Sequence, residues 1–131
     1  SFSRIYHFKN PVSPHWAAEK EASFIEPSNL KLPDLDELII IETAGGVMVP
    51  LNRDWLQIDQ LKVWGAPIIL VARTGLGTLN HTLLSLEALK HRNLNVLGIV
   101  LLPLGAISFL KSFIAVTNSS KTISVLFLLP E

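Results

Sequence analysis

The feature of this sequence best suited to chemistry is a carboxylate that precedes a pair of glycines. Glu42 comes directly after the apolar run Leu38–Ile41, and Gly45 and Gly46 follow shortly after it. Such a run predicts a buried strand of a parallel sheet, and open α/β sheets bind ligands beyond the carboxyl ends of their strands. Glycines let backbone N–H groups approach an anion, and Mg²⁺ prefers oxygen ligands. The pattern therefore predicts a site that holds Mg²⁺ and phosphate oxygens.

The phosphate-binding loop that often accompanies such an acid does not occur in this sequence. A P-loop reads Gly-x-x-x-x-Gly-Lys followed by serine or threonine, and the 131 residues contain no such string. The nearest glycine-rich stretch, Thr74–Thr78, has no lysine after it. Because the chain begins in the middle of a plausible segment, Ser1–Tyr6, we expect that an N-terminal portion is missing through truncation, splitting or sequence error.

The composition indicates one apolar domain without an excess of charge. Hydrophobic residues make up 49% of the 131 residues and charged residues 17%, which suits a single domain with its own core. The 11 lysines and arginines balance 11 aspartates and glutamates, which argues against a nucleic-acid partner. The lack of cysteine excludes disulfides and thiolate chemistry and fits a cytoplasmic protein. The longest apolar stretch, 96–110, is shorter than the roughly 20 residues of a membrane helix, so we expect no membrane span.

The apolar pattern predicts alternating strands and helices with short links, which implies βαβ units and a parallel sheet. We expect the first three strands to be buried. Ser13 is the expected N-cap of the first helix, with Pro14 as its first residue, and Gly65 the expected C-cap of the second. The predicted strands are Leu38–Ile41, Pro67–Val71, Val96–Leu101 and Thr122–Leu126, and the predicted helices are Trp16–Ala22, Asp54–Trp64, Thr78–His91 and Ala106–Val116.

Several other side chains are better explained by structure than by chemistry. His15 and His81 are single histidines in helical or apolar settings, where packing is the commoner role. Ser85 has no histidine and acid at a spacing that predicts a catalytic triad, so hydrolase chemistry is unsupported. The three tryptophans are most simply core or interface residues, and Arg53 is expected to be solvated.

Four stretches in order carry a resemblance to a known family. The two most specific strings are Pro11-x-Ser13-Pro14-His15 and Leu76-Gly77-x-x-Asn80-His81. Together, in their order and spacing, the stretches resemble the dethiobiotin synthetases over most of the chain. They are Tyr6–Ala18, Glu42–Asn52, Pro67–Val71 and Thr74–Leu89.

The resemblance implies a fold and a reaction. The implied fold is a P-loop NTPase-like, Rossmann-like α/β domain of three layers, in which residues 1–131 form a single incomplete domain that lacks the N-terminal strand and the P-loop. The family's enzymes are homodimers that use ATP, Mg²⁺ and CO₂ to close a cyclic urea on 7,8-diaminononanoate, which gives dethiobiotin for biotin biosynthesis. A carbamate forms on one amine and is phosphorylated, and the second amine then displaces phosphate. Protein groups contribute mainly positioning and charge neutralisation to such a step.

The resemblance also implies roles for individual residues. Glu42 matches the acid that binds Mg²⁺, directly or through water. Asn80 matches an asparagine that reaches across the dimer interface to the substrate carboxylate, where a helix N-terminus also favours an anion. The simpler alternatives are helix capping for Ser13 and Asn80 and a tight turn for the glycines. The resemblance also implies that Pro130 belongs to a proline loop near the nucleotide base. The implied substrate contacts are Pro11, Ser13, Gly45, Gly46, Leu76, Gly77 and Asn80.

The chain departs from the family in three ways. The P-loop and the lysine that follows it in the substrate site are absent, so no catalytic residue is assigned. Leu102 and Pro103 stand where the family has an asparagine that reads adenine. Residues 102–122 match the family poorly.

Two functions from different classes follow. The first is a dethiobiotin synthetase present as part of a longer or split enzyme. The alternative is a non-catalytic remnant that keeps the dimer and substrate surface but does not bind ATP. A weaker option is a relative of the cobyrinate or partition-type ATPases, against which the Asn80-His81 and Pro11-x-Ser13 pairings argue.

Overall fold

The computed structural model describes residues 6–32, 40–43, 45–103 and 123–128. Within these ranges it contains four strands, three α-helices and one short 3-10 turn, η1. The strands are β1 (Ile40–Glu42), β2 (Ile68–Arg73), β3 (Val96–Leu102) and β4 (Ile123–Leu128); the helical elements are α1 (Pro14–Lys20), η1 (Pro27–Asn29), α2 (Gln57–Trp64) and α3 (Thr78–His91).

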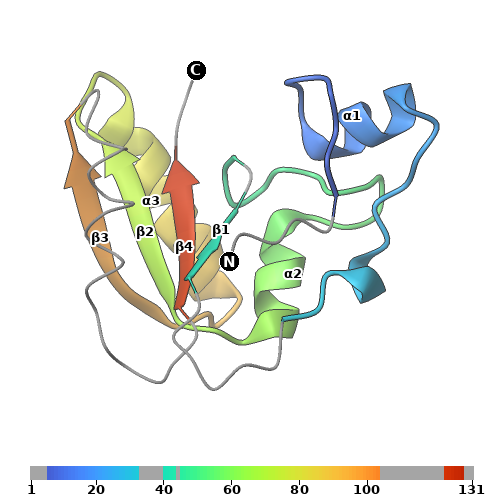
Figure 1. Cartoon of the computed structure of the whole chain (residues 1–131). Helices are drawn as coiled ribbons and strands as arrows, with labels where there is room; N and C mark the ends of the chain where they lie inside the picture. Colours follow the sequence, from blue (N-terminus) through green and yellow to red (C-terminus); the bar gives the residue numbers. More distant parts are fainter. Residues whose placement is uncertain (1–5, 33–39, 44, 104–122, 129–131) are drawn as a thin grey trace.

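The four strands form one parallel sheet in the order β1-β4-β2-β3, which confirms the predicted fold class (Figure 1). Because every described pair is parallel, the strands point the same way and their carboxyl ends meet at one edge. The register places Glu42 beside Val125, and Val125 beside Ile69 of β2. Strand β2 therefore extends four residues beyond the level at which β1 ends, to Arg73.

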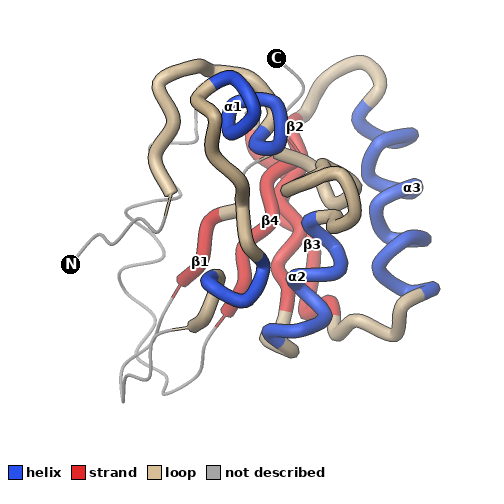
Figure 2. Tube along the Cα trace, turned by 90° about the vertical axis from the view of Figure 1, so that its right-hand side faces the viewer, coloured by secondary structure: helices blue, strands red, loops and turns tan. Residues whose placement is uncertain are grey.

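The main core lies between the sheet and helices α2 and α3. Ile68 and Leu70 are fully buried on one face of β2 and belong to the same apolar cluster as residues of both helices. Figure 2 shows α3 running alongside the strands. The helix predicted over Ala106–Val116 lies outside the described residues. The buried members of the cluster are Val47, Ile58, Leu61, Ile68, Leu70 and Leu89.

Helix α2 begins later than the sequence predicts, because the residues around Asp54 form a turn. The Oδ1 atom of Asn52 accepts the Asp54 N–H at 2.9 Å. The N-terminal end of the helix is capped by Asp59, whose Oδ2 accepts the Leu56 N–H at 3.0 Å. It ends at Gly65, which takes a left-handed φ of 62° and acts as the predicted C-cap.

The predicted burial of Val96–Leu101 is wrong, because β3 is the edge strand of the described sheet. Leu97 and Leu101 are 57% and 59% exposed, and Ile99 between them is 43% exposed. The opposite face of β3 is only partly covered. An apolar run looks the same in a central strand and in an edge strand, and pairing on only one side leaves β3 accessible.

Helix α1 packs in a second, smaller cluster away from the sheet. Ala18 of α1, Ile25 after it and Leu51 are buried together. The helix starts at Pro14 and ends at Lys20, so it is shifted towards the N-terminus from the predicted Trp16–Ala22. Ala22, two residues after the end of the helix, has a positive φ of 49°. This cluster packs α1 against the segment that precedes α2.

Candidate functional site

The acid predicted to bind metal lies at the carboxyl end of β1. Glu42 is the last residue of that strand and is exposed. Thr43 follows it and is only 7% exposed, and its Oγ1 has no hydrogen-bond partner among the described residues. The strand-end position predicted for Glu42 is therefore confirmed, whereas its metal role stays a prediction.

The turn after Glu42 favours a glycine at position 45. Gly45 has a φ of +76°, and a Cβ built there would lie 3.0 Å from Cγ2 of Val49. The Val49 N–H donates to the Gly46 carbonyl at 3.1 Å, which closes the turn. The Val47 carbonyl accepts the Ile58 N–H at 2.9 Å, which joins the turn to the start of α2. The turn is therefore held on a helix that belongs to the core.

The loop before α1 carries Pro11 and Ser13. Ser13 occupies the N-cap position, and its carbonyl accepts the Ala17 N–H at 2.9 Å, but its side chain makes no capping hydrogen bond. Helix capping therefore does not account for the serine hydroxyl. At the other end of α1, Oε1 of Glu21 accepts the Lys9 N–H at 2.7 Å, which fixes the approach to the loop.

The third predicted segment joins β2 to α3. Gly77 stands at the N-cap of α3 with a φ of +89°, a conformation that favours glycine. Leu76 before it is fully exposed, and Asn80 is exposed on the first turn of the helix. His81 is also exposed, so the packing role predicted for it is wrong.

The fold brings these segments to one end of the molecule. Glu42 and the loop after Arg73 follow parallel strands that are separated only by β4, which corresponds to a lateral distance of about 10 Å. Both views show α1 at the end towards which the strands point (Figures 1 and 2). The three predicted substrate segments therefore lie at the end of the molecule towards which the strands point, the end at which open α/β sheets bind ligands.

Comparison with known proteins identifies the family. A family model described as an AAA domain matches residues 1–121. The chain is 46% identical over 97 residues to a protein of Rhodopseudomonas palustris named ATP-dependent dethiobiotin synthetase BioD, covering 74% of this chain and 46% of that protein. Proteins of the same name from Brucella anthropi and Agrobacterium fabrum are 50% identical over 94 and 95 residues, covering 72% of this chain and 44% and 45% of theirs.

The chain belongs to this AAA family and is a relative of the dethiobiotin synthetases. The resemblance seen in the sequence is thereby confirmed. The chain spans about half the length of the curated dethiobiotin synthetases that it matches. No solved structure matched it. Among the described residues, no helix has both the length and the hydrophobicity needed to cross a membrane.

The residues predicted near the nucleotide are only partly described. Pro130 lies outside the described ranges. Leu102 ends β3 half-buried, and its carbonyl accepts the Thr74 N–H at 2.9 Å, so it is tied to the loop before α3. Pro103 is exposed. The structure therefore shows where Leu102 and Pro103, which replace the family's asparagine, lie, but it assigns them no role.

Sequence reasoning missed the polar contacts that join the segment before α2 to α1 and to the chain after it. Arg53 is exposed as predicted, but it forms an ion pair with Glu19. Asn52 is 6% exposed, and its amide donates to the Ile25 carbonyl at 3.0 Å. Both contacts join residues more than 25 positions apart, so no local pattern could have indicated them.

Proposed function

We propose that this chain provides the diaminononanoate-binding part of an ATP-dependent dethiobiotin synthetase. The observation that carries the proposal is the exposed Glu42 carboxylate at the end of a parallel strand, followed by a turn that a side chain at Gly45 would strain. The 46% to 50% identity to proteins named as dethiobiotin synthetases supports it. The reaction is the closure of a cyclic urea on 7,8-diaminononanoate with CO₂.

The donor set of the chain fits Mg²⁺ bound mainly by groups from outside the protein. No group of three or more His, Cys, Asp or Glu side chains that could hold a metal occurs in the described ranges. Mg²⁺ commonly uses one or two carboxylates and takes its remaining ligands from water and phosphate oxygens. Glu42 would supply that carboxylate. Mg-ATP, when bound, supplies the phosphoryl group that activates the substrate's carbamate.

The chain's own residues would bind and orient the two ends of the substrate. The Ser13 hydroxyl, which makes no capping bond, and the backbone around Pro11 and Gly45 would face the amines. Asn80 and the N-terminus of the 14-residue helix α3 would bind the carboxylate, and no acidic residue lies in that first turn to oppose it. Holding both amines in reach of one carbon is the main contribution a protein can make to ring closure.

We further propose that the protein is a cytoplasmic homodimer in which Asn80 of each chain binds the carboxylate of the substrate in the partner's site, so that the two ends of one substrate are bound by different copies of the chain. Apolar side chains along the first turns of α3 support an interface there. Leu79 and Leu83 are 77% and 63% exposed, and the fully exposed Leu76 precedes them. Large exposed apolar surfaces of this kind are typical of protein interfaces.

The second candidate is a non-catalytic chain that keeps the substrate surface without binding ATP. These 131 residues contain no P-loop string, which both candidates allow. The genomic DNA upstream of the codon for Ser1 separates the two candidates. A P-loop encoded there, in frame or after a frameshift, favours the enzyme, and a clear absence favours the remnant.

The direct test is dethiobiotin formation by the full-length protein that contains this chain. The protein is incubated with diaminononanoate, bicarbonate and Mg-ATP, and the product is measured by mass spectrometry. We expect ATP-dependent formation of dethiobiotin that Glu42→Gln reduces at least tenfold, because the amide removes the charge offered to Mg²⁺. Normal product formation by Glu42→Gln would refute the role of Glu42. Lack of product from the unaltered protein would refute the enzyme proposal.

A further inference from the structure

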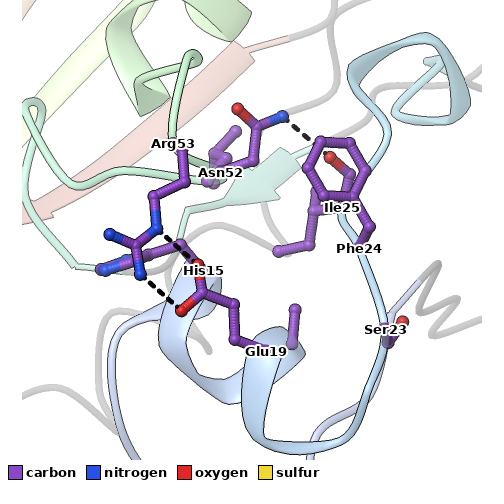
Figure 3. Close-up of a pocket in the computed structure, with 9 residues that line it drawn as sticks. His15, Glu19, Ser23, Phe24, Ile25, Asn52 and Arg53 are labelled. Atoms are coloured by element: carbon purple, nitrogen blue, oxygen red, sulfur yellow. Dashed lines mark hydrogen bonds and ion pairs between the residues drawn. The ribbon is translucent and has the colours of Figure 1, made fainter.

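Two adjacent residues after the glycine turn reach across to the chain around α1 (Figure 3). Nδ2 of Asn52 donates to the Ile25 carbonyl at 3.0 Å. Nε and Nη2 of Arg53 donate to the two carboxylate oxygens of Glu19 at 2.6 and 2.8 Å. We call Asn52 and Arg53, with the two groups that they contact, the clasp. Asn52 is buried and Arg53 is exposed.

The geometry of the clasp distinguishes it from an ordinary surface ion pair. An exposed pair contributes little in general, but a bidentate arginine–carboxylate contact is the favourable exception. The hydrogen bond from Arg53 lowers the pKa of Glu19 and so further favours the charged carboxylate. Beside the pair, Asn52 is 6% exposed and its Oδ1 accepts the Asp54 N–H at 2.9 Å. Both ends of the Asn52 amide are therefore engaged.

The position of α1 depends on contacts of this kind. The helix has only seven residues, and helices so short are not stable by themselves in water. It is placed by its buried Ala18 against Leu51 and Ile25, and by the clasp. The loop with Pro11 and Ser13 runs directly into its first turn. Where the clasp holds α1, it also holds that loop.

The other half of the clasp belongs to the segment that carries the glycine turn. Gly46 and Asn52 are joined by a stretch of chain whose backbone is bonded to the start of α2 through Val47 and Val49. The clasp therefore links the Pro11–Ser13 loop with the glycine turn, although the two lie more than 30 residues apart in the sequence.

We propose that Asn52 and Arg53 are positioning residues for diaminononanoate, which set the Pro11–Ser13 loop against the turn at Gly45 and Gly46. The inference rests on the proposed function. Neither residue need touch the substrate. Their effect is to hold two substrate-binding segments at the separation that the substrate requires.

The test is a calorimetric titration of the protein with diaminononanoate, together with a thermal unfolding curve for each variant. We expect Arg53→Gln and Glu19→Gln each to weaken binding about threefold, which is the size of effect that an exposed pair can have. Asn52→Ala should weaken it about tenfold, because a buried carbonyl loses its donor. The double variant Glu19→Arg with Arg53→Glu reverses the pair and should restore binding to near the original affinity.

A second ion pair serves as the control. Arg92 lies 4.0 Å from Asp59, between the end of α3 and α2, and is remote in sequence from the clasp. Arg92→Gln makes the same substitution in a longer, partly buried ion pair and should leave diaminononanoate binding unchanged. Equal binding by Arg53→Gln and the unaltered protein, or an equal loss in Arg92→Gln, would overturn the inference while the proposed function stands. No binding by the unaltered protein would overturn the proposed function and the inference with it.

Discussion

At the scale of single residues, the site depends on backbone positions that only particular side chains tolerate. Gly45 and Gly77 both have positive φ values and border two of the three substrate segments. Ser13 occupies an N-cap position without using its hydroxyl for the cap. These residues could be singled out from the sequence by type and spacing. Their backbone conformations and unused hydrogen-bonding groups needed the structure.

Replacing Gly45 tests the strain argument. Gly45→Ala places a Cβ 3.0 Å from Cγ2 of Val49 at a φ of +76°. We expect the free energy of unfolding to fall by about 1–3 kcal/mol, because an alanine is strained there. Gly75→Ala is the matched control, since its Cβ would meet nothing within 4 Å and its φ isn't in the left-handed region. Equal urea unfolding curves for the two variants would contradict the argument.

Replacing Asn80 tests whether this residue contacts the substrate or only caps helix α3. Asn80→Ala in the full-length protein should weaken diaminononanoate binding about 10- to 150-fold, because a hydrogen bond to a charged group is worth about 1.5–3 kcal/mol. ATP binding should change little. A mixed dimer with one altered chain should lose one site and keep the other. Unchanged substrate KM and kcat with only a lower Tm would show that Asn80 serves the helix alone.

At the scale of elements, the sequence predicts the order of strands and helices well, but it predicts their burial and their exact ends less well. The periodicity of α3 gives its bounds, Thr78–His91, because an amphipathic pattern is a local property. The run Val96–Leu101 gives a strand, but its burial depends on what lies beside it in the sheet, and β3 lies at the edge. The start of α2 depends on two side-chain hydrogen bonds: Asn52 accepts the Asp54 N–H in a turn that competes with helix formation, and Asp59 accepts the Leu56 N–H where the helix begins.

Two substitutions within α2 test whether this helix packs in the core. Leu61 is 1% exposed in the main cluster, and Val63 two positions later is 66% exposed. Leu61→Ala should lower the free energy of unfolding by about 2–5 kcal/mol, because it leaves a cavity between α2 and the sheet. Val63→Ala should change it by about 0.5 kcal/mol or less. A comparable loss in both variants, measured by urea unfolding, would mean that α2 does not pack as described.

At the scale of the whole molecule, the parallel sheet gathers segments that are distant in the sequence. Its order, β1-β4-β2-β3, brings the turn after Glu42 and the loop after Arg73 to one edge with a single strand between them. A parallel sheet was predictable from the alternation of apolar runs, whereas the insertion of β4 between β1 and β2 was not. Such pairings are non-local, and no periodicity in the chain encodes them.

The measurement that tests the account most directly is a calorimetric titration of this chain, once with diaminononanoate and once with Mg-ATP. We predict saturable binding of diaminononanoate, because the three substrate segments lie at the same end of the molecule. We predict little heat with Mg-ATP, because the backbone N–H groups of a P-loop normally make most phosphate contacts and this chain has no P-loop string. Micromolar binding of Mg-ATP with no binding of diaminononanoate would contradict the account.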